Sequence, residues 1–207
     1  MKIDALADPQ DLWRRQNERE QGDATIQKLH MEIGCLSTTW EGVEDDFSHL
    51  FQVLVETVSP AARRAYGSMM SGHARREAMR EASTIFFERH PSTDNKKRFG
   101  RLIEHLKEAS KRRDDVVHGV SAQFVFPDGD RGHFIVPPNY NSNFTHAITK
   151  TGPPYWRHLR AEYRYSSEDL ITLAANFRVL RDALNEYVTH LTTQYGLPGS
   201  PKAWQSE

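Results

Sequence analysis

One stretch decides the fold, residues 92–119, with the sequence STDNKKRFGRLIEHLKEASKRRDDVVHG. Its apolar side chains recur at spacings of three, four, three and seven, which puts them on one face of an α-helix: Phe99, Leu102, Leu106, Ala109 and Val116. Pro91 precedes the stretch, and Gly119 is a typical C-terminal stop. We therefore predict a long helix from Ser92 or Thr93 to His118.

The same periodicity predicts helices over residues 24–58 and 166–195, and start and stop residues delimit two more, over 60–70 and 73–90. The first of these helices is either continuous or broken near Gly34. Ser59 and Pro60 resemble an N-cap followed by proline at the first helical position, and the polar residues 166–169 are expected to cap the last helix.

The hydrophobic period changes after Gly119. Two short apolar runs, 120–126 and 133–137, flank the turn-rich hexapeptide Pro-Asp-Gly-Asp-Arg-Gly, and this combination is typical of a β-hairpin. Prolines and asparagines predict loop over 137–154, and 155–165 is a candidate further strand. The expected fold class is mainly α, a helical bundle with a small β-hairpin insertion before the last helix.

The length of 207 residues suits one domain, expected over 24–195 with the insertion at about 120–165, between an N-terminal segment (1–23) and a flexible tail (196–207). The single cysteine, Cys35, allows no intramolecular disulfide, as in the reducing cytoplasm. The chain has no apolar stretch of about 18 residues and no apolar signal at its N-terminus. We expect a cytoplasmic protein without a membrane partner.

The net charge of −1 conceals an uneven distribution. Residues 1–58 hold 5 Lys or Arg against 12 Asp or Glu, whereas residues 61–113 hold 14 against 6. This basic block can attract a polyanion such as RNA. The alternative is a set of solvated helix faces, which is the commoner meaning of a charge run.

Common catalytic motifs are missing from the sequence, including phosphate loops, the Gly-x-Ser-x-Gly elbow and paired cysteines, and the histidines show no metal-ligand spacing. We expect no metal and no cofactor. Arg113 interrupts the apolar stripe of residues 99–116, and Glu44 interrupts the stripe of the first long helix. Because an unpaired buried charge is costly, a Glu44–Arg113 contact is expected. Alternatively, both side chains lie along helix edges with their charges in solvent.

Arg113 and His118 do not share a helix face, because five residues of α-helix turn through about 500° and leave the two roughly 140° apart. Two copies packed about a twofold axis at this helix end could bring the arginine of one chain to the histidine of the other. The sequence therefore favours a homodimer with a composite site.

Residues 113–118, Arg-Asp-Asp-Val-Val-His, place a polar residue directly after the arginine and the histidine near the end of a late helix. This segment resembles the signature of the HEPN family, and the resemblance covers about residues 24–119 and 166–195. It implies a small helical bundle that dimerises around the motif and a metal-independent RNase of a toxin or antiviral defence system. RNA and an inhibitor or antitoxin protein are the implied partners. Val120 departs from members paired with a nucleotidyltransferase antitoxin, which often carry tyrosine there.

The chemistry of the residue pair fits RNA cleavage. A histidine with an ordinary pKa near about 6.5 can take the 2′-hydroxyl proton, and an arginine fork can stabilise the phosphorane oxygens. We expect His118 and Arg113 in these roles, with Asp114 orienting them. Arg112 is expected to contact a neighbouring phosphate and Glu44 to support the site.

Non-catalytic roles of His118 and Arg112 also fit the sequence. His118 could merely interact with the last carbonyls of its helix, and Arg112 could be a solvated charge. At the level of function, the alternative to a ribonuclease is a non-catalytic HEPN-like module that dimerises or binds nucleic acid through the same helix end.

Overall fold

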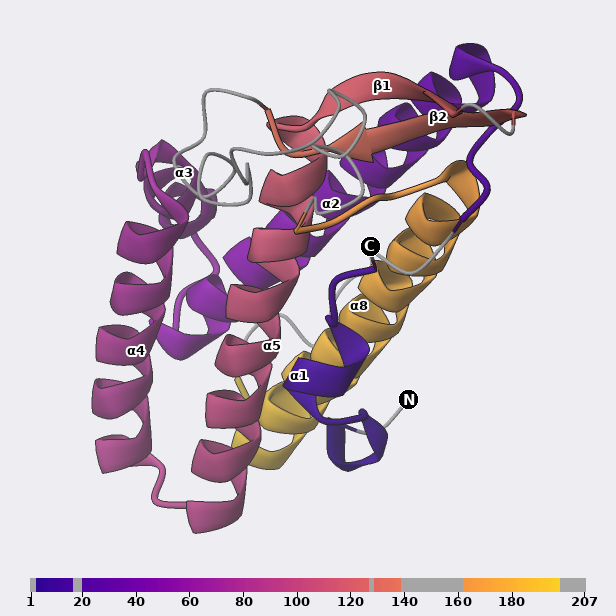
Figure 1. Cartoon of the computed structure of the whole chain (residues 1–207). Helices are drawn as coiled ribbons and strands as arrows, with labels where there is room; N and C mark the ends of the chain where they lie inside the picture. Colours follow the sequence, from indigo (N-terminus) through magenta and orange to yellow (C-terminus); the bar gives the residue numbers. More distant parts are fainter. Residues whose placement is uncertain (1–2, 17–19, 127–128, 139–161, 198–207) are drawn as a thin grey trace, which may run out of the picture. The chain divides into compact units, whose positions relative to one another are not determined.

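The computed structural model describes residues 3–16, 20–126, 129–138 and 162–197 (Figure 1). Its elements, in chain order, are η1 (Ile3–Ala5), α1 (Pro9–Leu12), α2 (Ile26–Leu54), α3 (Pro60–Ser68), α4 (Gly72–Arg89), α5 (Thr93–Val117), β1 (Val120–Phe126), β2 (Gly129–Val136) and α8 (Ser167–Tyr195). The chain is mainly helical, with a β-hairpin before the last helix. The predicted fold class is therefore confirmed.

The helix starts follow from local side-chain chemistry. Ser59 caps α3, because its Oγ accepts a hydrogen bond from the backbone N of Ala61 at 3.2 Å, and Pro60 takes the first helical position. At the start of α8, the Ser166 backbone N donates to Asp169 Oδ2 at 2.8 Å while the Asp169 N faces Ser166 Oγ at 3.5 Å. Both predicted caps are confirmed. α2 continues through Gly34, so the predicted alternative of a break there is wrong.

The contacts divide the chain into two compact units. Unit 1 comprises Met1–Pro9, Glu41–Lys107 and Phe177–Glu207, and unit 2 comprises Gln10–Trp40 and Glu108–Asn176. α2, α5 and α8 each have residues in both units. The expected N-terminal segment is part of the folded chain, since Ile3, Leu6 and Trp13 are all buried.

Unit 1 is built from helices that bury one apolar face each. Figure 1 shows α4 antiparallel to the first part of α5, and Arg80 of α4 forms an ion pair with Glu104 of α5 at 3.6 Å. Hydrogen bonds join α5 to α8. The Tyr187 hydroxyl donates to the Asn95 carbonyl at 2.8 Å, and the Asn95 side-chain amide donates to Gln194 at 2.9 Å. Asn95 is itself buried, so its hydrogen bonds fix which parts of the two helices meet.

Unit 2 contains the β-hairpin, whose strands pair in register from Val120 opposite Val136, with an irregularity after Phe124. Strand β2 starts at Gly129, inside the hexapeptide that we predicted as turn, and Gly132 adopts a left-handed φ of 81° within the strand. Residues Asp23 and Tyr165 form isolated bridges with β2. Of the predicted strand 155–165, residues 155–161 lie outside the described residues, as does loop 139–154.

Gly119 ends α5 for a reason other than the predicted one. Its φ is not in the left-handed region that favours glycine at a helix end. Instead, a Cβ on Gly119 would lie 2.4 Å from Ile135 Cγ2 and 2.7 Å from the Asp115 carbonyl oxygen. The residue is glycine because β2 packs too closely on the last turn of α5 for any side chain.

Within residues 3–16, 20–126, 129–138 and 162–197, every helix is too short or too polar to cross a membrane.

Substituting Gly119→Ala should lower the free energy of unfolding by about 1–3 kcal/mol, the usual cost of overpacking. Gly34→Ala is the matched control, since a Cβ there meets nothing within 4 Å. It should raise the free energy of unfolding by about 0.5–1 kcal/mol through helix propensity. Urea unfolding of both variants measures the difference, and equal effects would contradict the close-packing explanation.

His105 predicts a pH dependence of stability. The side chain is fully buried on α5, and burial, with the charge of Arg101 second, lowers the pKa of its imidazole from 6.5 to about 4. The unfolded chain therefore binds more protons between these values. The contribution of His105 to the free energy of unfolding should be fully present above pH 6.5, and roughly 3 kcal/mol of it should be lost as the pH approaches 4. Comparing the pH dependence of urea unfolding for the natural chain and His105→Gln isolates this contribution, which the variant should lack.

Candidate functional site at the end of α5

The last turn of α5 presents the predicted motif at the surface of unit 2. Arg113 keeps 31% of its side chain exposed, and Asp114 keeps 57%. The Arg113 guanidinium donates from Nη1 to Asp114 Oδ1 at 3.0 Å. His118 follows the helix and is exposed, while its backbone N still donates to the Asp114 carbonyl at 3.0 Å.

The opposite side of the same turn is anchored by a buried carboxylate. Asp115 is only 8% exposed and accepts two hydrogen bonds from Arg15, from Nε at 3.0 Å and from Nη2 at 2.8 Å. The Tyr165 hydroxyl donates to the same carboxylate at 3.2 Å, and the Tyr163 hydroxyl donates to the Asp115 backbone carbonyl at 2.8 Å. We call Asp115, Arg15, Arg112, Tyr163 and Tyr165 the Asp115 network.

Arg112 completes the network without a hydrogen bond from its Nε. That atom lies 3.2 Å from Asp115 Oδ2, within ion-pair distance, but the alignment is too poor for a hydrogen bond. The attraction between the two charges still acts, because both side chains are buried and poorly screened. Two arginines therefore neutralise Asp115, and Glu162 balances Arg15 at 2.9 Å.

The titration of the network follows from its burial. Burial, with the charge of Asp115 second, raises the pKa of both Tyr163 and Tyr165, so these hydroxyls stay protonated as donors. Burial by itself would lower the pKa of Arg15, but the hydrogen bond and attraction of Asp115 raise it above the ordinary value. The network thus holds its charges and donors fixed at neutral pH.

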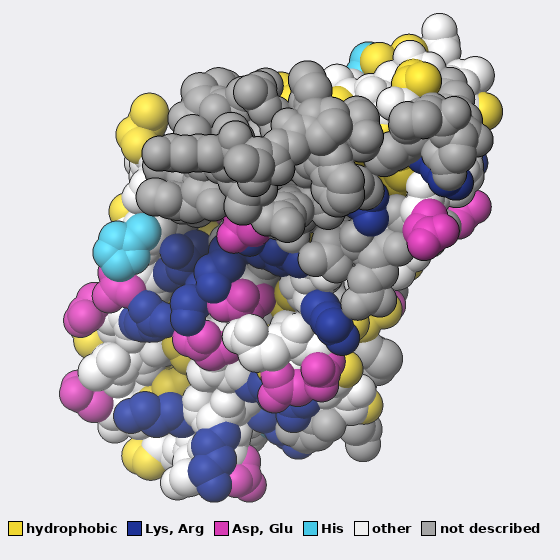
Figure 2. Space-filling view, in the orientation of Figure 1, with side chains coloured by type: hydrophobic (Ala, Val, Ile, Leu, Met, Phe, Trp, Pro, Cys, Tyr) yellow, Lys and Arg dark blue, Asp and Glu magenta, His cyan; other side chains and the backbone are white. Residues whose placement is uncertain are grey.

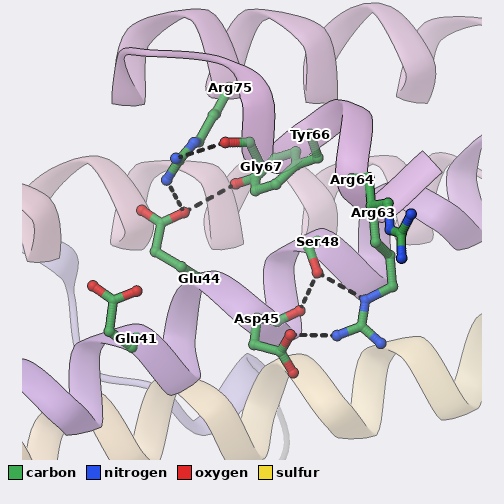
Figure 3. Close-up of a pocket in the computed structure, with 9 residues that line it drawn as sticks. All are labelled: Glu41, Glu44, Asp45, Ser48, Arg63, Arg64, Tyr66, Gly67 and Arg75. Atoms are coloured by element: carbon green, nitrogen blue, oxygen red, sulfur yellow. Dashed lines mark hydrogen bonds and ion pairs between the residues drawn. The ribbon is translucent and has the colours of Figure 1, made fainter. Parts of the chain in front are cut away.

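The predicted supporting residues lie in two different settings. Arg112 is buried beside Asp115, so its interpretation as a solvated charge is wrong: the residue three positions later on the helix draws it inward. Its predicted phosphate contact stays a prediction. Glu44 belongs to unit 1, where its Oε2 accepts from Arg75 at 2.9 Å (Figure 3). Arg113 and Glu44 thus each have a charged partner in their own unit, and a direct pairing between them stays a prediction.

The basic block of residues 61–113 is largely ion-paired. At least eight of its basic side chains face carboxylates: Arg63, Arg75, Arg80, Arg89, Lys107, Lys111, Arg112 and Arg113. Figure 2 shows Lys and Arg side chains beside Asp and Glu over α4 and the first part of α5. Most of the block is therefore neutralised locally, which weakens the expectation that it attracts RNA as a whole.

Sequence reasoning missed the roles of Arg15 and Asp115. Asp115 stands inside the motif, but the sequence does not distinguish it from Asp114, because both are acidic residues near a helix end. The spacing of polar residues was the one sequence feature that could have indicated the network. Polar residues recur at intervals of three, four and three at His105, Glu108, Arg112 and Asp115, and the structure buries all four. A polar stripe beside an apolar one can mark a buried network.

Nothing in the described part of the chain gathers three His, Cys, Asp or Glu side chains in a way that could hold a metal ion. No protein-family model matches the chain, and no curated protein or solved structure matches it either. The resemblance to the HEPN family therefore stays a prediction from the sequence of residues 113–118.

Removing Arg15 should destabilise the chain far more than removing Arg113. Arg15→Met leaves Asp115 with a buried, partly unpaired charge, at a cost of roughly 2–3 kcal/mol, because one-third of Arg15 is exposed and part of the interaction is screened. Arg113→Met breaks a more exposed pair, worth less than about 1 kcal/mol. Urea unfolding of the two variants tests the ranking, and similar losses would mean that the network does not anchor the helix end.

Proposed function

We propose that the protein is a HEPN-like, metal-independent endoribonuclease that acts as a homodimer in the cytoplasm. Arg113 and His118 are its catalytic residues, and Asp114 orients the arginine. The observation that carries the proposal is the end of α5, where the Asp115 network holds the last turn in place. The Arg113 guanidinium, partly exposed, and the His118 imidazole, exposed just after the helix, are both left accessible there.

The exposed groups supply what RNA cleavage needs. The imidazole of His118 takes the proton of a 2′-hydroxyl, whose oxygen attacks the adjacent phosphorus to form a 2′,3′-cyclic phosphate. The 5′-oxygen of the next nucleotide leaves and takes a proton from water. The Arg113 guanidinium stabilises the charge that develops on the phosphorane oxygens. Asp114 holds that guanidinium at 3.0 Å, which limits the conformations it must lose when it binds a phosphate.

A homodimer solves the geometric problem of the motif. The spacing of the motif, at the helical 100° per residue, puts the two residues about 140° apart, so a single chain is not expected to aim them at one phosphate. An isologous contact around the end of α5 pairs each arginine with the histidine of the second copy and creates two equivalent composite sites. An inhibitor protein of a toxin or phage-defence system would act by covering these sites.

A non-catalytic module is the second candidate, and one observation favours it. The Arg113 guanidinium is already engaged by Asp114, and an arginine held in an ion pair has fewer donors for phosphate. In this interpretation the helix end binds nucleic acid or a second copy without cleaving anything. Both candidates use the same residues, and the chemistry of the products separates them.

Purified protein should cleave labelled RNA in the presence of EDTA and leave 2′,3′-cyclic phosphates, because the reaction needs the 2′-hydroxyl and no metal. His118→Ala should lower the rate by roughly 10² or more, and Arg113→Lys should also fail because an ammonium lacks the bidentate fork. His73→Ala, at another exposed histidine, is the matched control and should cleave normally.

Two results would contradict the ribonuclease. Activity that EDTA abolishes points to a contaminating or metal-dependent nuclease, and natural rates in His118→Ala remove the proposed base. RNA that binds but is never cut, with a 2′-deoxy substrate bound equally well, would support the non-catalytic module instead.

Mixing two inactive variants tests the composite site directly. A dimer of one His118→Ala chain and one Arg113→Ala chain has one site with both residues intact and one site with neither. Random mixing makes about half of the dimers mixed, so about a quarter of the natural activity should return. If each chain carries a complete site of its own, the mixture will stay inactive.

A further inference from the structure

A pocket in unit 1 is lined by residues other than Arg113, Asp114 and His118. It has a volume of about 440 Å³ and lies among α2, α3 and α4 (Figure 3). Glu41, Glu44 and Asp45 of α2 line it together with Arg63, Arg64 and Arg75. Three acidic and three basic side chains therefore surround one hollow that is large enough for a small molecule.

Four of these six side chains hold one another and form the walls. Arg63 pairs with Asp45, and its Nε donates to Ser48 Oγ at 3.0 Å. Arg75 donates from Nη1 to Glu44 Oε2 at 2.9 Å and from Nε to the Met69 carbonyl at 3.2 Å. The Tyr66 hydroxyl meets the same Glu44 oxygen at 3.5 Å. These contacts preorganise the pocket, because the long side chains already occupy fixed positions.

The remaining two charges are open to a ligand. Among the residues that the structure describes, neither Glu41 nor Arg64 has an ion-pair partner, and both are exposed. Glu41 stands one helical turn before Glu44, whose second oxygen, Oε1, accepts none of the hydrogen bonds just described. Figure 3 shows the carboxylates of Glu41 and Glu44 at one end of the pocket and Arg64 at the other.

We propose that this pocket binds a small zwitterion, with its cationic group between Glu41 and Glu44 and its anionic group on Arg64. The balance of charges selects such a ligand. A simple anion would meet three carboxylates and a simple cation three guanidiniums, whereas a molecule with both charges, separated by a short chain, matches the two ends. Amino acids with a basic side chain belong to this class.

Gly67 offers a way to fill the pocket without disturbing its walls. The residue lines the pocket on α3, and a Cβ added to it meets nothing within 4 Å. A larger side chain there enters open space, and it also replaces a glycine in a helix, which favours folding. Gly100 on α5 is equally open but does not line the pocket, so it serves as the matched control.

The experiment is an NMR titration of the whole chain with L-arginine, and with agmatine, which has the guanidinium but no carboxylate. L-arginine should shift resonances of the pocket residues and bind at least about tenfold more tightly than agmatine, because a charge-assisted hydrogen bond contributes on this scale. Glu41→Gln and Arg64→Gln should each weaken L-arginine binding by about tenfold. Gly67→Leu should abolish the binding, whereas Gly100→Leu should leave it unchanged.

Three outcomes would overturn the proposal. Equal affinity for L-arginine and agmatine would show that no anionic group is recognised, and binding of inorganic phosphate in place of both would mark an anion site. No residue-specific shift with L-arginine at about 10 mM, the weak end of specific binding, would show that the pocket selects no zwitterion of this size. None of these results bears on RNA cleavage, since the substituted residues are not those of the ribonuclease site.

Discussion

The end of α5 depends on one ion pair, the bidentate contact between Arg15 and Asp115. A buried carboxylate is tolerated only when its oxygens are fully engaged, and here two guanidiniums and a phenol engage them. The pair also sets the rotation of the helix. Each residue of an α-helix turns it by about 100°, so Arg113, two residues before Asp115, points about 160° away from the buried side. The outward direction of Arg113 is thus a direct consequence of where Asp115 is held.

The two units use charge in different ways. In unit 2 Asp115 and Arg112 are buried and Arg15 is partly buried, and all three are ion-paired, so these charges fix structure. Around the pocket of unit 1 the ion pairs are partly exposed and neutralise one another, while Glu41 and Arg64 are left for other contacts. Buried charged residues with several partners stabilise the fold, whereas exposed ones with few partners can bind a ligand.

Local pattern was sufficient to predict most of the helices. The three-and-four spacing of apolar residues located α2, α5 and α8, and the breakers on either side delimited α4. Ser59 and Ser166 marked helix starts because capping involves residues only a few positions apart. The Asp115 network could not be predicted in this way. Arg15 and Asp115 lie 100 residues apart, and periodicity identifies the face of a helix but not what packs on it. Glu44 shows the same limit, since its place on an apolar stripe indicated a cationic partner but did not identify Arg75 on α4, which donates to it.

The span of the Asp115 network along the chain has a consequence for biosynthesis. A ribosome completes α5 well before it adds Tyr163 and Tyr165, which follow Asp115 by 48 and 50 residues. Until those tyrosines emerge, the carboxylate has only part of its hydrogen-bond shell, and contacts between such distant residues form late. The helix end that carries Arg113 and His118 therefore gains its full set of contacts only after Tyr165 has been translated.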